Sequence, residues 1–177
     1  MKKPILLIIL LIFFIACGQG SSKKKSSKSY ADTELTTYYL IRHAEKDRSD
    51  SSNKNPGLTE AGMERARNWA SFFDSIPLDQ IYSTDYHRTQ QTASFTASNQ
   101  NVMVETYDPK ELNSDDFKAL TLGQTVLIVG HSNTTPMFVN KIIGKETYPW
   151  MDDKDNASLY KVTIQNEQAK VVVMKVD

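Results

Sequence analysis

Apolar and polar residues follow a regular pattern along the chain from residue 35 onward. Short apolar runs, typical of strands, alternate with longer segments in which apolar residues recur at helical spacing. The runs predict four strands, at residues 37–41, 80–82, 102–106 and 125–129. The helical segments begin near residues 60, 85, 115 and 136. Two further runs, 158–165 and 170–176, alternate in polarity and predict an antiparallel hairpin.

This alternation of strands and helices favours a mainly parallel sheet with helices on both faces. Residues 125–129 form a continuous apolar run between Gly123 and Gly130, as expected for a strand that is covered on both sides. We therefore expect residues 35–177 to form one α/β domain. Its predicted architecture is a three-layer α/β/α sandwich with a mainly parallel sheet and an antiparallel C-terminal edge hairpin.

Polar residues mark the expected helix ends. Thr59 is a suitable N-cap for the first helix, which Pro77 must stop. Ser83 or Thr84 can cap the next helix, predicted over residues 85–97, so that Arg88 falls near its first turn. The last predicted helix starts near residue 136 and ends by residue 144.

The N-terminal segment predicts export and lipid attachment. Lys2 and Lys3 precede an apolar stretch over residues 5–16, which is shorter than the ~20 residues that span a bilayer. Residues 14–17 resemble a bacterial lipobox that ends in Cys17, the only cysteine. We therefore expect a lipoprotein signal peptide over 1–17, a lipid anchor on Cys17 and a flexible Ser/Lys-rich tether over 18–34. The alternatives are an uncleaved hydrophobic anchor or a cysteine that lies by chance near an ordinary cleavage site.

Such an anchor predicts a place in the bacterial cell envelope, facing the periplasm or the exterior. The chain has 177 residues and a formal net charge of +0, which fits one domain and gives no overall attraction to nucleic acid. Any preference for an anion must therefore come from a local pocket.

Four cation-capable side chains are predicted at the rim where such a sheet binds ligands. They are Arg42, His43, Arg88 and His131. A guanidinium matches the oxygens of a phosphoryl group, and a neutral imidazole can act as a nucleophile or carry a proton near neutral pH. The expected partner is a small phosphorylated substrate or a phosphoprotein.

Several segments around these residues resemble the motifs of one family, and they occur in the family's order. Residues 40–46 (LIRHAEK) are similar to the Arg-His signature of the histidine phosphatase superfamily, which includes the cofactor-dependent phosphoglycerate mutases. Residues 58–62, 82–93 and 129–133 resemble its later motifs. The chain is identified as a phosphoglycerate mutase-like, branch 1 member of that superfamily and as a bacterial lipoprotein.

The resemblance implies a metal-independent phosphatase of the histidine acid type, a phosphoric monoester hydrolase without a cofactor. His43 would form a covalent phosphohistidine, while Arg42, Arg88 and His131 would hold the phosphoryl oxygens. Hydrolysis is expected rather than mutase activity, because the chain has little room for the insertions that enclose a phosphoglycerate. Many members also carry a glutamate general acid, for which this chain offers three candidates without a clear match: Asp108, Glu111 and Glu45. The substrate therefore stays open.

The first loop holds the cations Lys46, Arg48 and Lys54, interleaved with Asp47 and Asp50. The mixture of signs favours a solvated loop over a second anion site.

Parts of the sequence are also compatible with three rival functions. Residues 130–134 nearly match the nucleophile elbow of serine hydrolases, but Thr134 stands where that motif needs glycine. A metal site from His43, His87 and His131 lacks typical ligand spacing. The third is a non-catalytic lipoprotein that binds a phosphorylated ligand or a partner on the same fold.

Overall fold

The computed structural model describes residues 34–111 and 113–176. The predicted signal peptide, Cys17 and nearly all of the predicted tether lie outside these residues. Within the described part of the chain, no helix combines the length and the apolar character that a membrane crossing requires.

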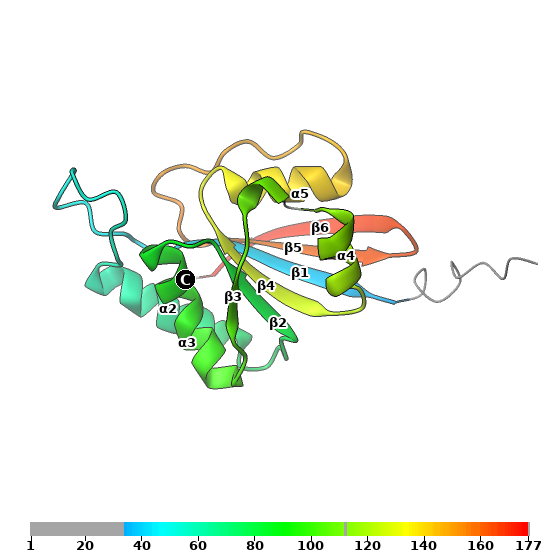
Figure 1. Ribbon diagram of the computed structural model, residues 1–177, viewed down its shortest axis with the longest axis horizontal. Helices are drawn as coiled ribbons and strands as arrows, with labels where there is room; N and C mark the ends of the chain where they lie inside the picture. The colour runs from blue at the N-terminus through cyan, green and yellow to red at the C-terminus, as the bar shows by residue number, and fades with distance from the viewer. Residues whose placement is uncertain (1–33, 112, 177) are drawn as a thin grey trace, which may run out of the picture.

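The centre of the fold is a six-stranded sheet with the order β3-β2-β4-β1-β5-β6 (Figure 1). Neighbouring strands from β3 to β1 are parallel, whereas β5 runs antiparallel to β1, and β6 antiparallel to β5. The predicted mainly parallel sheet with an antiparallel edge hairpin is confirmed. The strands are β1 (Thr36–Arg42), β2 (Gln80–Ser83), β3 (Val104–Thr106), β4 (Thr125–Gly130), β5 (Ser158–Gln165) and β6 (Gln168–Lys175).

Helices cover both faces of this sheet. Successive residues of a strand point to opposite faces, so Tyr38 and Leu40 of β1 join one apolar core while Tyr39 and Ile41 join the other. Helices α4 and α5 pack on the first core, and α2 and α3 on the second (Figure 1). The helices are α2 (Glu60–Phe73), α3 (His87–Gln100), α4 (Asp115–Leu120) and α5 (Thr134–Ile143), with a 3₁₀ turn, η1, at Pro109–Glu111.

The start of α2 fixes the loop that follows β1. Thr59 caps the helix as predicted, because its Oγ1 accepts a hydrogen bond from the Gly62 amide at 3.1 Å. A Cβ on Gly62 would lie 2.3 Å from the carbonyl oxygen of Glu45, so only glycine lets the helix approach this closely. The first turn of helix α2 therefore packs directly against the backbone of Glu45, two residues after His43.

Two predicted helix starts need correction. Helix α3 begins at His87 rather than at residue 85, and its N-cap residue, Tyr86, makes no side-chain capping bond. Neither Ser83 nor Thr84 caps it: the Ser83 hydroxyl donates to the Thr84 carbonyl, and the Thr84 hydroxyl faces His131. Helix α5 begins at Thr134, two residues before Pro136.

Candidate active site

Paired strand ends bring the two predicted site histidines together. Arg42 at the end of β1 lies in register with Gly130 at the end of β4. The His43 amide continues this pairing and donates to the Gly130 carbonyl at 2.9 Å. The side chain of Asn156 donates to the His43 carbonyl at 2.8 Å, so the backbone of His43 is held from both sides.

The surroundings of His43 select one tautomer. Its Nδ1 lies 2.7 Å from the Ala44 carbonyl oxygen. A carbonyl can only accept, so Nδ1 carries the proton and Nε2 keeps a free lone pair. Burial, with the charges of Arg42 and Arg88, lowers the pKa of His43 to about 3. The imidazole is therefore neutral near pH 7 and suited to nucleophilic attack through Nε2.

A chain of hydroxyl groups orients His131. Thr84 Oγ1 lies 2.8 Å from Nε2 of His131 and donates its own proton to Thr89 Oγ1 at 3.0 Å. Thr84 therefore accepts Nε2–H, which leaves Nδ1 of His131 unprotonated and 3.5 Å from Nη2 of Arg88. Burial, followed by the charges of Arg88 and Arg42, lowers the pKa of His131 to about 4.

Arg42 is buried and Arg88 is half-buried, and both have buried guanidinium nitrogens with spare donors. The Arg88 guanidinium lies 4.3 Å above the ring of Tyr86, and its Nε and Nη1 have no hydrogen-bond partner. Arg42 is 3% exposed and also has an unpartnered Nε. Unpaired buried donors are costly unless an acceptor completes them. Both side chains are therefore poised to bind an anion.

A cavity of about 410 Å³, here called the histidine cavity, is lined by all four predicted site residues. The structure thus brings together residues from β1, from the first turn of α3 and from the end of β4. The complete lining is Arg42, His43, Lys46, Tyr86, Arg88, Pro109, His131, Ser132, Asn133, Thr134 and Asp153.

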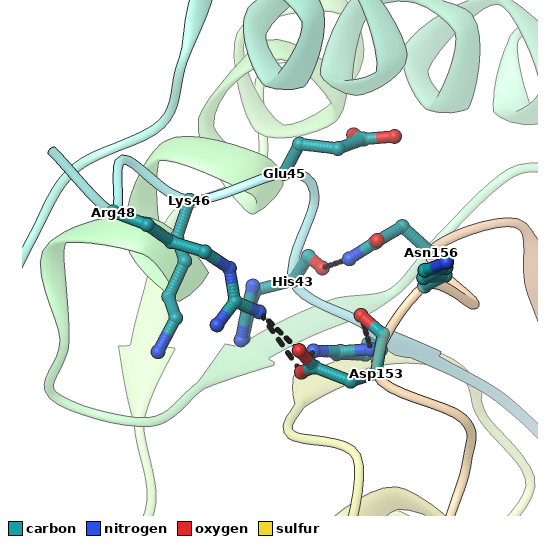
Figure 2. A pocket seen from close by; sticks show the side chains of 8 residues that line it. His43, Glu45, Lys46, Arg48, Asp153 and Asn156 are labelled. Carbon is teal, nitrogen blue, oxygen red and sulfur yellow. Dashed lines mark hydrogen bonds and ion pairs between the residues drawn. The ribbon is translucent and has the colours of Figure 1, made fainter.

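The three candidate general acids lie elsewhere. Asp108 and Glu111 line a separate cavity beside β3 and α4, not the histidine cavity. Glu45 pairs with Nε of Arg65 at 2.7 Å, and Figure 2 shows its carboxylate turned away from the imidazole of His43.

The acidic residue of the histidine cavity is Asp153, which the sequence analysis missed. Its carboxylate binds Nη2 of Arg42 at 2.9 Å and Nη2 of Arg48 at 2.7 Å (Figure 2). These hydrogen bonds lower the pKa of Asp153, so it stays ionised and cannot supply a proton near neutral pH. Arg42 also donates from Nη1 to the carbonyls of Asp152 and Asp153, at 2.9 Å each. The missed residues lie in an irregular segment between α5 and β5, where no periodic pattern or motif marks them.

The rival sites do not assemble in the described residues. His87 is exposed and does not line the histidine cavity, and no three potential metal-binding side chains cluster in the described ranges 34–111 and 113–176. No hydrogen bond joins the Ser132 hydroxyl to an imidazole within the same ranges, and Thr134 instead accepts the His131 amide at 2.9 Å.

Comparisons with known proteins find a matching family model and similar folds. Residues 38–121 match the family model of the histidine phosphatase superfamily (branch 1). The fold is similar to that of a phosphoglycerate mutase from Bacillus anthracis, with 15% identity, a TM-score of 0.62 and coverage of 81% of this chain and 94% of that one. It is also similar to the protein histidine phosphatase SixA complexed with tungstate (19% identity, TM-score 0.65, coverage 78% and 96%).

An alpha-ribazole phosphatase from Shigella flexneri shares the fold with 17% identity and a TM-score of 0.60, over 78% of this chain and 96% of that one. The comparison with curated proteins finds no match. The family match spans the first histidine and second arginine motifs, and the shared fold extends over the second histidine. Over residues 38–121 this chain matches the histidine phosphatase superfamily, branch 1, and its fold is similar to those of a phosphoglycerate mutase and of SixA.

Proposed function

We propose that the protein hydrolyses a phosphate monoester or phosphoramidate through a covalent phosphohistidine on His43. The observation that carries this proposal is the neutral, buried imidazole of His43 in one cavity with two arginines that have buried, unpartnered donors. A nucleophile and fixed cationic donors are the parts that phosphoryl transfer needs from a protein.

In the first step, Nε2 of His43 attacks phosphorus, and the bond from phosphorus to the leaving group breaks. The leaving atom departs with the electron pair and takes a proton from water. Arg42 and Arg88 donate to the equatorial oxygens, where the charge of the loose transition state resides. The unprotonated Nδ1 of His131 faces Nη2 of Arg88 and positions that guanidinium. In the second step a water oxygen attacks phosphorus, the N–P bond breaks, its electron pair returns to Nε2, and a water proton passes to solvent.

The leaving group must be a good one. Asp153 is the only carboxylate that lines the histidine cavity within the described residues, and its two arginine partners keep it ionised. A phosphoramidate nitrogen can be protonated by solvent before it leaves, and an aryl oxygen leaves readily as an anion. The similar fold of the protein histidine phosphatase SixA supports the same choice.

The proposal is tested by rapid quenching with a labelled aryl phosphate. We expect protein-bound phosphate that is acid-labile and alkali-stable, and that His43→Ala abolishes. His87→Ala is the matched control, because this imidazole is exposed and outside the cavity. Undiminished hydrolysis by His43→Ala would overturn the mechanism.

We also propose that Cys17, which lies outside the described residues, carries the lipid that anchors the protein to the cell envelope. Two or more acyl chains give stable membrane attachment. Cys17→Ser should release the protein into the soluble fraction, and continued membrane retention of that variant would refute the anchor.

A further inference from the structure

A second cavity, of about 380 Å³, opens beside His43 and is here called the basic annex. It shares four lining residues with the histidine cavity: Arg42, His43, Lys46 and Asp153. Its other lining residues are Glu45, Arg48, Lys154 and Asn156 (Figure 2). A ligand that reaches His43 can therefore extend into the annex.

Only some of the charged residues in the loop after β1 line the annex. Lys46 and Arg48 line the annex, but Lys54 does not. Asp47 and Asp50 are turned into the loop itself, where Asp47 accepts from the Ser49 amide and Asp50 from the Ser52 amide, each at 2.9 Å. Asp47, Arg48 and Asp50 are exposed, as expected for a solvated loop, but of the charged residues at positions 46–54 only Lys46 and Arg48 line the annex.

Positive charge in the annex exceeds negative charge. Its two carboxylates are both engaged: Glu45 pairs with Arg65, outside the annex, and Asp153 is shared between Arg42 and Arg48. Lys46 is half-buried, and neither Lys46 nor Lys154 forms an ion pair with any acidic residue in ranges 34–111 and 113–176. Burial and the nearby Arg48 lower the pKa of Lys46, as expected for an ammonium group without a counter-ion.

We propose that the natural substrate carries a second anionic group, which binds Lys46 and Arg48 in the basic annex while its phosphoryl group meets His43. This inference rests on the proposed function, since it names the substrate class of the same site. The second anion would share Arg48 with Asp153, whose side chain is 69% exposed.

Binding of phosphonates, which cannot be hydrolysed, tests the inference without turnover. Titration calorimetry on the full-length protein would compare phosphonoalkanoates of increasing chain length with their primary amides, which have the same shape but no second charge. Bisphosphonates of the same lengths show whether a second phosphoryl group binds as a carboxylate does. We expect the best acid to bind about tenfold more tightly than its amide, from two exposed ion pairs.

Charge-removing variants locate the effect. Lys46→Gln and Arg48→Gln should each reduce the acid-to-amide affinity ratio by roughly two- to fivefold. Lys54→Gln is the matched control: it removes a cation from the same loop but outside the annex, and should keep the ratio of the wild-type protein. Equal affinities for acid and amide in the wild-type protein, or an equal loss of preference in all three variants, would overturn the inference.

The phosphohistidine trapping experiment separates this inference from the proposed function. If the protein binds the acids more tightly than the amides but no phosphate is trapped on His43, the second anion site is supported and the phosphatase mechanism is refuted. If phosphate is trapped on His43 but acids and amides bind equally well, the phosphatase mechanism is supported and the second anion site is refuted.

Discussion

The imidazole rings of His43 and His131 meet edge to face, with 5.5 Å between their centroids and 68° between their planes. His43 is buried and His131 is half-buried. Each ring has one nitrogen hydrogen-bonded to the protein, Nδ1 of His43 to the Ala44 carbonyl and Nε2 of His131 to Thr84 Oγ1. Two imidazolium cations at this separation, beside Arg42 and Arg88, would repel one another. The arrangement is therefore built for neutral rings.

The protonation of these rings gives the first prediction. Their pKa values of about 3 and about 4 should keep both imidazoles neutral in mildly acidic solution, where an ordinary histidine, with a pKa near ~6.5, is protonated. An NMR titration of the ring nitrogens should show that neither His43 nor His131 becomes protonated near neutral pH. Protonation of His43 with an ordinary pKa would contradict this prediction.

The same shifts predict how stability depends on pH. Because both pKa values are lower in the folded protein than the ~6.5 of an unfolded histidine, the unfolded state binds more protons at pH values between them. The free energy of unfolding should therefore fall as the pH drops from ~6.5 towards 4. Thermal melts over this range would measure it, and a melting temperature that does not fall as the pH drops would contradict the prediction.

Removal of Arg88 should affect turnover far more than folding. Arg88→Ala deletes a half-buried cation with two buried, unpartnered donors, and by analogy with a lost oxyanion donor we expect kcat to fall by about 100- to 1000-fold. Arg67→Ala is the control, since this arginine lies on α2 outside the histidine cavity. Steady-state kinetics with an aryl phosphate would decide, and equal rates for the two variants would exclude phosphoryl binding by Arg88.

Thr84 should act as a positioning residue for His131. Thr84→Val removes the acceptor that holds Nε2–H, and we expect a loss of about tenfold in kcat/KM, together with an altered pKa of His131 by NMR. Thr96→Val makes the same chemical change at another buried threonine, whose hydroxyl has no partner. That control should keep full activity. If both variants behave alike, Thr84 has no special role in the site.

Asp153 should restrain anion binding rather than donate a proton. Asp153→Asn removes a carboxylate that competes for Arg42 and Arg48, so KM for an aryl phosphate should fall while kcat changes little. Asp108→Asn, in a neighbouring cavity, should leave both constants unchanged. A series of aryl phosphates should show rates that rise steeply as the leaving group becomes more acidic. A flat series that becomes steep in Asp153→Asn would instead identify Asp153 as the general acid.

The site was predictable where local chemistry and strand pattern agree. His43 and His131 follow continuous apolar runs, and the parallel pairing of β1 with β4 brings such ends together. Arg88 was placed correctly in the first turn of its helix, although the predicted start was two residues early. The sequence does not distinguish a threonine that caps a helix from one that orients a histidine. The role of Thr84 depends on His131, which lies 47 positions away in the sequence.

The residues that the sequence did not reveal act through long-range contacts. Asp153 reaches a partner 111 residues away, and Asn156 one 113 residues away, from a segment without periodicity. The direction of the charges in the first loop was also hidden, because short turns decide which way Asp47 and Asp50 face. Such contacts exist only once the sheet has formed.

The buried guanidinium of Arg42 has a consequence for how this site can evolve. Its Nη1 donates to three backbone carbonyls of the segment between α5 and β5, whereas its Nε has no partner. Lysine has a single nitrogen and could satisfy the segment or an anion, but not both. Selection for anion binding and selection for the conformation of the segment between α5 and β5 therefore act on the same side chain. Substitution of Arg42 would be disfavoured even in a descendant that has lost its substrate.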